Sequence, residues 1–176
     1  MISKGTVANS TLYPDIQALI PRAMARCVLP LWKAFHNGKS HLSISIAIKA
    51  LMKGYKVLFT PVSELLHNLN AAKADNTYYQ KVDYYLKPDL LILDELGFKR
   101  LPGYSADDFF EIISKRYEKR SVIITTNKTF EQWGDIFTDN ILASAILDRV
   151  VHYSTIIKIN GPSFRAKDLK KGVDKF

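Results

Sequence analysis

The chain has 176 residues, of which 25 are Lys or Arg and 17 are Asp or Glu, giving a formal net charge of +8. With 47% hydrophobic and 24% charged residues, the composition is that of an ordinary globular protein of about one domain, which excludes extensive disorder. The positive surplus favours phosphate-bearing partners such as nucleic acid, and by itself fits a merely basic soluble protein equally well.

Cysteine content and hydropathy bear on the compartment. The single cysteine, Cys27, cannot form an internal disulfide, which fits a reducing compartment. No apolar run approaches the roughly 18 to 20 residues that a membrane-spanning helix requires. The apolar part of residues 16–32 is interrupted by prolines and arginines, unlike a secretory signal. We therefore expect a cytoplasmic protein without a membrane partner.

Short β-branched apolar runs alternate with longer helical patterns after the first residues, which predicts crossover units and an α/β fold with a mostly parallel sheet. Continuous apolar runs such as Leu90–Leu93 indicate strands that are covered by helices on both faces. In chain order, the strands are predicted at Cys27–Trp32, Tyr55–Thr60, Pro88–Asp94, Ser121–Thr126 and Ser154–Ile159.

Helical patterns lie between these strands. Residues Ser40–Lys53 carry apolar side chains at helical spacing and end before a glycine, and Pro61 is expected in the first turn of the next helix. Ser105 is expected to cap a later helix, with Asp107 and Asp108 in its first turn. The remaining helices are predicted at Thr77–Leu86, Ser105–Glu118, Thr129–Phe137 and Asn140–Val151.

The segment Gly38-Lys39-Ser40 stands between a predicted strand and a predicted helix, where the G-K-[S/T] end of a phosphate-binding loop belongs. In such a loop the backbone amides face the phosphates, the lysine reaches their terminal oxygens, and the hydroxyl coordinates Mg²⁺. The full loop has two further glycine positions, which Lys33 and His36 occupy here. Taken alone, the tripeptide fits a surface turn before a helix at least as well as a phosphate site.

Polar residues also end two of the predicted strands. Asp94 and Glu95 follow a buried parallel strand, at the edge where open α/β sheets bind ligands. The pair resembles a Walker B motif, in which Asp94 would hold Mg²⁺ and Glu95 would orient or deprotonate the attacking water. Asn127 follows the next strand and could position water or bind a γ-phosphate. The alternatives are two solvated acids at a strand end and an ordinary turn asparagine.

Several linked motifs, among them LDELG, TTN and AILDR, are similar to the IstB family of AAA+ ATPases, which are transposition helper proteins related to DnaC helicase loaders. The similarity covers about Gly38–Arg165. It implies a P-loop fold of the AAA+ type, with residues 1–26 an N-terminal remnant, 27–165 the ATPase core and 166–176 a basic tail. The two similar segments read LLILDELGFKRLPGYSADDFFEIISKRYEKRSVIITTNKTFEQWGDIF and ASAILDRVVHYSTIIKINGPSFR.

The resemblance also implies roles for individual residues. Arg149 looks like an arginine finger that acts on the nucleotide of a neighbouring subunit, and Arg165 resembles the family's C-terminal sensor arginine. The alternatives are an exposed charge paired with Asp148 or a neighbour, and a member of the lysine-rich tail. The remaining matches are Gly38, Lys39 and Ser40 to Walker A, Asp94 and Glu95 to Walker B, and Asn127 to sensor 1.

The function that the resemblance implies is ATP binding and hydrolysis with Mg²⁺ by a homo-oligomer on DNA, which assists a transposase. The basic residues of the core and the tail would bind DNA phosphates without sequence preference, a solvated charge face being the alternative. Within the core these residues are Lys115, Arg116, Lys119 and Arg120. The competing interpretations are a non-catalytic DNA- or partner-binding remnant, a DnaC-like helicase loader and, more distantly, a small-molecule P-loop kinase.

Two features depart from the family pattern. Family members usually carry a helical N-terminal region of several dozen residues, whereas only residues 1–26 precede the first predicted strand. Lys33 and His36 replace loop glycines. Together these features predict a truncated or degenerate copy whose nucleotide affinity is weak or lost, as the alternative to an active ATPase.

Overall fold

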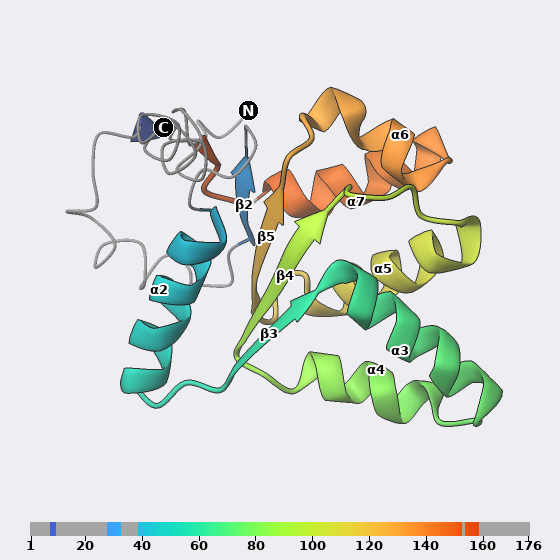
Figure 1. The fold of residues 1–176 in the computed structure, drawn as a ribbon, viewed down its shortest axis with the longest axis horizontal. Coiled ribbons are helices and arrows are strands. Elements are labelled where there is room, and N and C mark those ends of the chain that lie inside the picture. Colours follow the sequence, from blue (N-terminus) through green and yellow to red (C-terminus); the bar gives the residue numbers. More distant parts are fainter. Residues whose placement is uncertain (1–7, 10–27, 33–38, 153, 159–176) are drawn as a thin grey trace, which may run out of the picture.

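The computed structural model describes residues 8–9, 28–32, 39–152 and 154–158 (Figure 1). Within them the strands form one sheet in the order β1-β6-β2-β5-β4-β3, and every neighbouring pair is parallel. The predicted parallel sheet is therefore confirmed. The strands are β1 (Ala8–Asn9), β2 (Val28–Trp32), β3 (Val57–Pro61), β4 (Leu90–Leu96), β5 (Ser121–Thr126) and β6 (Ile157–Lys158).

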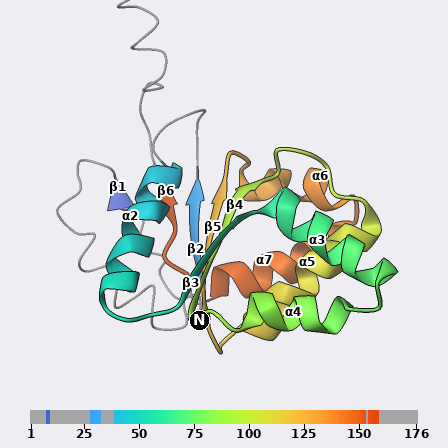
Figure 2. The same cartoon turned by 60° about the horizontal axis from the view of Figure 1, so that its bottom comes forward.

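Helices cover both faces of this sheet. Figures 1 and 2 show α2 on one face and α3, α4, α5, α6 and α7 on the other. This arrangement is the predicted one for strands joined by crossover connections. The elements are α2 (Lys39–Met52), α3 (Val62–Ala74), α4 (Tyr78–Leu86), α5 (Gly103–Arg116), the 3-10 turn η2 (Phe130–Gln132), α6 (Trp133–Phe137) and α7 (Asn140–His152).

The strand β4 contributes side chains to two separate hydrophobic cores. Leu91 and Leu93 belong to the larger core beneath α3, α5 and α7, and Leu90 and Ile92 belong to the smaller core beneath α2. All four side chains are fully buried. Because successive side chains of a strand point to opposite faces, an unbroken apolar run is what burial on both faces requires.

Two predicted helix starts are wrong. Pro61 is the last residue of β3, paired in register with Asp94, and its extended backbone places the first helical residue at Val62. The helix α5 begins at Gly103 rather than at Ser105. Asp108 therefore lies beyond the first turn, where it is buried and its carboxylate lies 2.8 Å from Nζ of Lys73.

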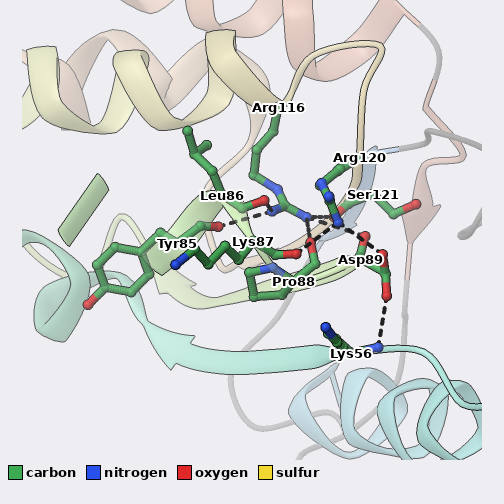
Figure 3. A network of polar contacts seen from close by, with 9 residues as sticks. All are labelled: Lys56, Tyr85, Leu86, Lys87, Pro88, Asp89, Arg116, Arg120 and Ser121. Atoms are coloured by element: carbon green, nitrogen blue, oxygen red, sulfur yellow. Dashed lines mark hydrogen bonds and ion pairs between the residues drawn. The ribbon is translucent and has the colours of Figure 1, made fainter. Parts of the chain in front are cut away.

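The prediction that Arg116 binds DNA phosphates is also wrong. Its side chain is 1% exposed and lies at the amino-terminal edge of the sheet (Figure 3). Burial lowers the pKa of this guanidinium to about 10, so the group stays charged at neutral pH. Its two terminal nitrogens donate hydrogen bonds of 2.7 to 3.3 Å to the backbone carbonyls of Tyr85, Leu86, Pro88, Asp89 and Ser121.

These carbonyls explain why a charge is tolerated there. Tyr85 and Leu86 end α4, where helix carbonyls lack partners within the helix. Arg116 satisfies them and connects α4 to the start of β5 at Ser121. Asp89 continues the network, since its carboxylate accepts from Nη1 of Arg120 at 2.9 Å and from the amide of Lys56 at 2.9 Å. The two arginines therefore stabilise the edge of the sheet opposite to Asp94.

Candidate nucleotide-binding site

The carboxyl-terminal edge of the sheet gathers most of the predicted site residues that the structure describes. The strand β5 lies between β2 and β4, and α2 begins at Lys39, soon after β2 ends. The first turn of α2 therefore stands at the same edge as the end of β4. In parallel α/β sheets this edge is where ligands bind.

Ser40 and Asp94 lie in contact although they are 54 residues apart in the sequence. The Ser40 hydroxyl is 3.0 Å from both carboxylate oxygens of Asp94. Asp94 is buried, and among the described residues it belongs to no ion pair with a lysine or arginine. Carboxylate and hydroxyl oxygens together are ligands that a divalent cation such as Mg²⁺ takes in proteins.

Thr125, on the neighbouring strand β5, is a site residue that sequence reasoning missed. Its hydroxyl donates a short hydrogen bond to Asp94 and accepts one of 2.9 Å from the backbone amide of Glu95. The side chain is 1% exposed. Thr125 therefore fixes both the carboxylate of Asp94 and the backbone that follows it. The one signal in the sequence was a threonine near the end of the strand that Asn127 follows.

Glu95 adopts a backbone conformation that is uncommon for a residue with a side chain. Its φ is +62°, and the register between β4 and β5 shifts between Leu93 and Leu96. The irregularity leaves the Glu95 side chain exposed, whereas its neighbours Asp94 and Leu96 are buried. Such local bulges are commonly found where a side chain must be re-aimed at a site.

Lys39 is placed close to both acidic residues. Partial burial lowers the pKa of its ammonium group, while the nearby carboxylates of Asp94 and Glu95 act in the opposite direction. The first turn of α2 thus holds a half-buried cation beside two anions. This arrangement can bind a polyanion through Lys39 and a divalent cation through Ser40 and Asp94.

The residues present fit Mg²⁺, which is usually bound by one or two carboxylates together with substrate phosphates. Asp94 and the Ser40 hydroxyl supply such a partial set of oxygen ligands. No group of three or more His, Cys, Asp or Glu suited to a metal ion occurs among the described residues. An ion at this edge would therefore need oxygens from a phosphate ligand as well.

Asn127 lies at the same edge of the sheet as Asp94, whereas Arg149 lies elsewhere in the fold. Asn127 follows β5 and is half-buried beside a hollow that also contains Gly97 of the β4–α5 loop. Arg149 is in the last turn of α7, where it donates to the carbonyl of Ala145 at 2.8 Å and stacks over the ring of Phe110 at 4.7 Å. An arginine finger acts on a neighbouring subunit, so this role stays a prediction.

Other predicted residues lie outside the described part of the chain. These are Gly38, Lys33 and His36 of the predicted phosphate loop, and Arg165 of the predicted sensor. The predicted boundary between residues 26 and 27 and the tail 166–176 also lie there. In the part of the chain that the structure covers, no helix is long and apolar enough to cross a membrane.

The fold is that of a P-loop protein of the AAA+ type. The sequence profile of the family described as IstB-like ATP binding protein matches residues 31–172. The chain belongs to this family, as its linked motifs predict.

Two curated relatives come from bacterial insertion sequences. An IS21 ATP-binding protein of Pseudomonas aeruginosa is 42% identical over 134 residues, which is 76% of this chain and 51% of that protein. An IS232 ATP-binding protein of Bacillus thuringiensis subsp. berliner is 45% identical over 131 residues, which is 74% of this chain and 52% of that protein. The chain thus spans about half the length of the curated relatives it matches.

Solved structures of helicase loaders share the fold. DnaI superimposes with a TM-score of 0.69 at 26% identity, covering 89% of this chain and 87% of that structure. The DnaC helicase loader superimposes with a TM-score of 0.67 at 22% identity, covering 81% of this chain and 86% of that structure. The predicted resemblance to helicase loaders is therefore confirmed at the level of the fold.

Proposed function

We propose that the chain binds ATP with Mg²⁺ and hydrolyses it, in a homo-oligomer that acts on DNA together with a transposase. The observation that carries the proposal is the contact of Ser40 with both carboxylate oxygens of Asp94, with Lys39 beside them. The relatives from insertion sequences support the link to transposition.

Each residue of this group has a role in phosphoryl transfer. Lys39 neutralises the β- and γ-phosphates, and the half-buried position of its ammonium strengthens this attraction. Ser40 and Asp94 hold the metal ion through hydroxyl and carboxylate oxygens. When bound, Mg²⁺ neutralises charge on the transferred phosphoryl group. Thr125 keeps Asp94 in place through the hydrogen bond from its hydroxyl.

Glu95 and Asn127 act on the attacking water. The exposed carboxylate of Glu95 accepts a proton from the water, whose oxygen forms a bond to the γ-phosphorus while the bond to the ADP oxygen breaks. Asn127, at the end of the adjacent strand, orients the water or the γ-phosphate. Arg149 and Arg165 are proposed to contact the phosphates, the former across a subunit interface and hence only in an oligomer.

The proposed contact with DNA needs different cations from those first predicted. Arg116 is buried, Arg120 pairs with Asp89 at 2.9 Å, and Lys115 pairs with Glu111 at 2.6 Å. Of the four core cations, Lys119 is exposed and takes part in no ion pair described for this chain. Surface pairs of this kind contribute little stability, but they reduce the charge that is available to phosphates.

A titration with a fluorescent ATP analogue in the presence of Mg²⁺ tests the proposal. We expect saturable binding that weakens at least about tenfold in Lys39→Ala, since one charge-assisted phosphate contact is worth about 1.5 to 3 kcal/mol. Lys53→Ala, just beyond the other end of α2, is the matched control and should bind like the wild type. Equal affinities of wild type and Lys39→Ala would contradict the proposed site. Binding without release of phosphate would contradict hydrolysis alone and favour the non-catalytic alternative.

A further inference from the structure

The loop between β4 and α5 carries an exposed aromatic ring next to two exposed cations. Phe98 is 75% exposed, and Lys99 and Arg100 follow it, both on the surface. Large aromatic side chains normally dominate cores and interfaces, because each buries a large apolar area. The loop therefore presents an apolar ring and two positive charges side by side to solvent.

These residues line a hollow of about 360 Å³ at the carboxyl-terminal edge of the sheet. Lys99, Arg100 and Lys128 bring three positive charges to it, against the single carboxylate of Asp135 among the lining residues. None of the three cations takes part in an ion pair within the described residues, unlike Lys73, Lys115 and Arg120. The hollow is therefore suited to an anionic ligand.

The walls of the hollow are held in place by close packing and by hydrogen bonds. Gly97 has a φ of +85°, and a Cβ atom there would lie 2.7 Å from Cδ1 of Ile136 and 2.9 Å from Cγ of Lys128. The far end of the loop is fixed by the Leu101 amide, which donates to the carbonyl of Ile136 at 2.7 Å. The amide of Lys128 donates to Oγ1 of Thr126 at 3.1 Å. Such preorganised walls reduce the entropy that binding costs.

We propose that this hollow, lined by Phe98, Lys99, Arg100 and Lys128, binds a single-stranded stretch of nucleic acid. The cations contact the phosphates and the ring of Phe98 stacks on a base, the combination found where unpaired strands are bound. The volume of this hollow is in the range of sites for small ligands, which suits one unpaired nucleotide. The inference rests on the proposed action on DNA and names the surface that performs it.

The hollow also adjoins the proposed nucleotide site. Asn127 lines it, and Gly97 lies two residues after Glu95. A strand in the hollow would therefore contact the same side chain that is proposed to orient the γ-phosphate or the water. The affinity for the strand should consequently differ between the ATP-bound and nucleotide-free protein, with reciprocal coupling.

Fluorescence anisotropy of a labelled oligonucleotide of about 20 nucleotides, longer than the ~4–16 that one binding module covers, tests the site. The whole chain is titrated against the single strand and against the matching duplex. Lys99→Gln/Arg100→Gln should weaken single-strand binding about tenfold or more and lower the salt slope by about 0.7 for each lost phosphate contact. Phe98→Ala should weaken single-strand binding about fivefold or more, and duplex binding less.

Lys53→Gln/Lys56→Gln removes the same charge at two exposed lysines elsewhere and is the matched control. Because Phe98, Lys99 and Arg100 are exposed, each variant should unfold at the temperature of the wild type. Unchanged affinity in the loop variants, an equal loss in the control, or an equal loss of duplex binding in Phe98→Ala would overturn the proposal. A wild-type chain that binds neither oligonucleotide, while still binding ATP, would overturn the DNA part of the proposed function and this site with it.

Discussion

Replacing Thr125 with valine removes a single hydroxyl from the core of the candidate site and keeps the shape of the side chain. The change deletes the hydrogen bond to Asp94 and leaves the amide of Glu95 without its 2.9 Å acceptor. A hydrogen bond to a charged group is worth about 1.5 to 3 kcal/mol. If about 2 kcal/mol of this hydrogen-bond free energy serves to align Asp94 for catalysis, the activation free energy rises by that amount and the rate of phosphate release should fall roughly 30-fold.

Thr126 provides a matched control on the same strand. It is equally buried, and its hydroxyl donates to the carbonyl of Leu96 at 2.8 Å and accepts from the amide of Lys128 at 3.1 Å. Thr126→Val should cost a similar free energy of unfolding, about 1 to 3 kcal/mol, because it also leaves buried polar groups unpaired. It should, however, change phosphate release per folded molecule by no more than about twofold, since it does not contact Asp94.

The assay combines phosphate release, the affinity for Mg-ATP and amide hydrogen exchange. Thr125→Ser should restore most of the rate, because it restores the hydroxyl. Independently of any activity, the Glu95 amide should exchange about tenfold faster in Thr125→Val than in the wild type, since it loses its acceptor. Equal rates and equal exchange in Thr125→Val and Thr126→Val would refute the positioning role of Thr125.

Three further predictions concern stability. Arg116→Met should lower the free energy of unfolding by about 3 to 5 kcal/mol in urea titrations, because it leaves several buried carbonyls unpaired; a loss below about 1 kcal/mol would contradict the network of Figure 3. Gly97→Ala should lower the free energy of unfolding by about 1 to 3 kcal/mol, because the backbone of Gly97 is left-handed and a Cβ atom would clash with Ile136. Gly103→Ala has open space around it and should leave the stability nearly unchanged. Thermal unfolding compares the two variants. Lys39→Met should stabilise the protein at neutral pH, because a lowered lysine pKa means that folding disfavours the charged form. This gain in the free energy of unfolding should shrink as pH rises through the lowered pKa toward 10.5. A lower free energy of unfolding in Lys39→Met than in the wild type at neutral pH would contradict the prediction.

The sheet could be predicted from the sequence because its central buried strands are continuous apolar runs. Leu90–Leu93 shows this directly, since its four side chains alternate between two cores and all are buried. The proximity of Ser40 and Asp94 followed from parallel topology, because the first turn of α2 and the end of β4 stand at the same edge of the sheet. Local pattern and strand direction were sufficient for these features.

The rest depended on partners that are distant in the sequence. Arg116 looks like any other member of a basic helix end, and its burial follows from carbonyls that lie about 30 residues earlier in the chain. The role of Thr125 requires the pairing of β4 with β5 and the bulge at Glu95, neither of which leaves a periodic signal. The start of α5 was missed because Pro102 and Gly103 precede the serine that resembled a cap.

The most direct test of the central claim is the Mg²⁺ dependence of ATP binding in the wild type and in Asp94→Asn. Isothermal titration with ATP in Mg²⁺ and in EDTA should show wild-type affinity at least about tenfold higher with Mg²⁺, since the carboxylate supplies the ion's charged protein ligand. Asp94→Asn, which keeps the size of the side chain, should lose this difference while retaining the affinity measured in EDTA. Saturable ATP binding that is equally strong with and without Mg²⁺, and unchanged by Asp94→Asn, would contradict the assignment of Ser40 and Asp94 as the metal-binding part of a nucleotide site.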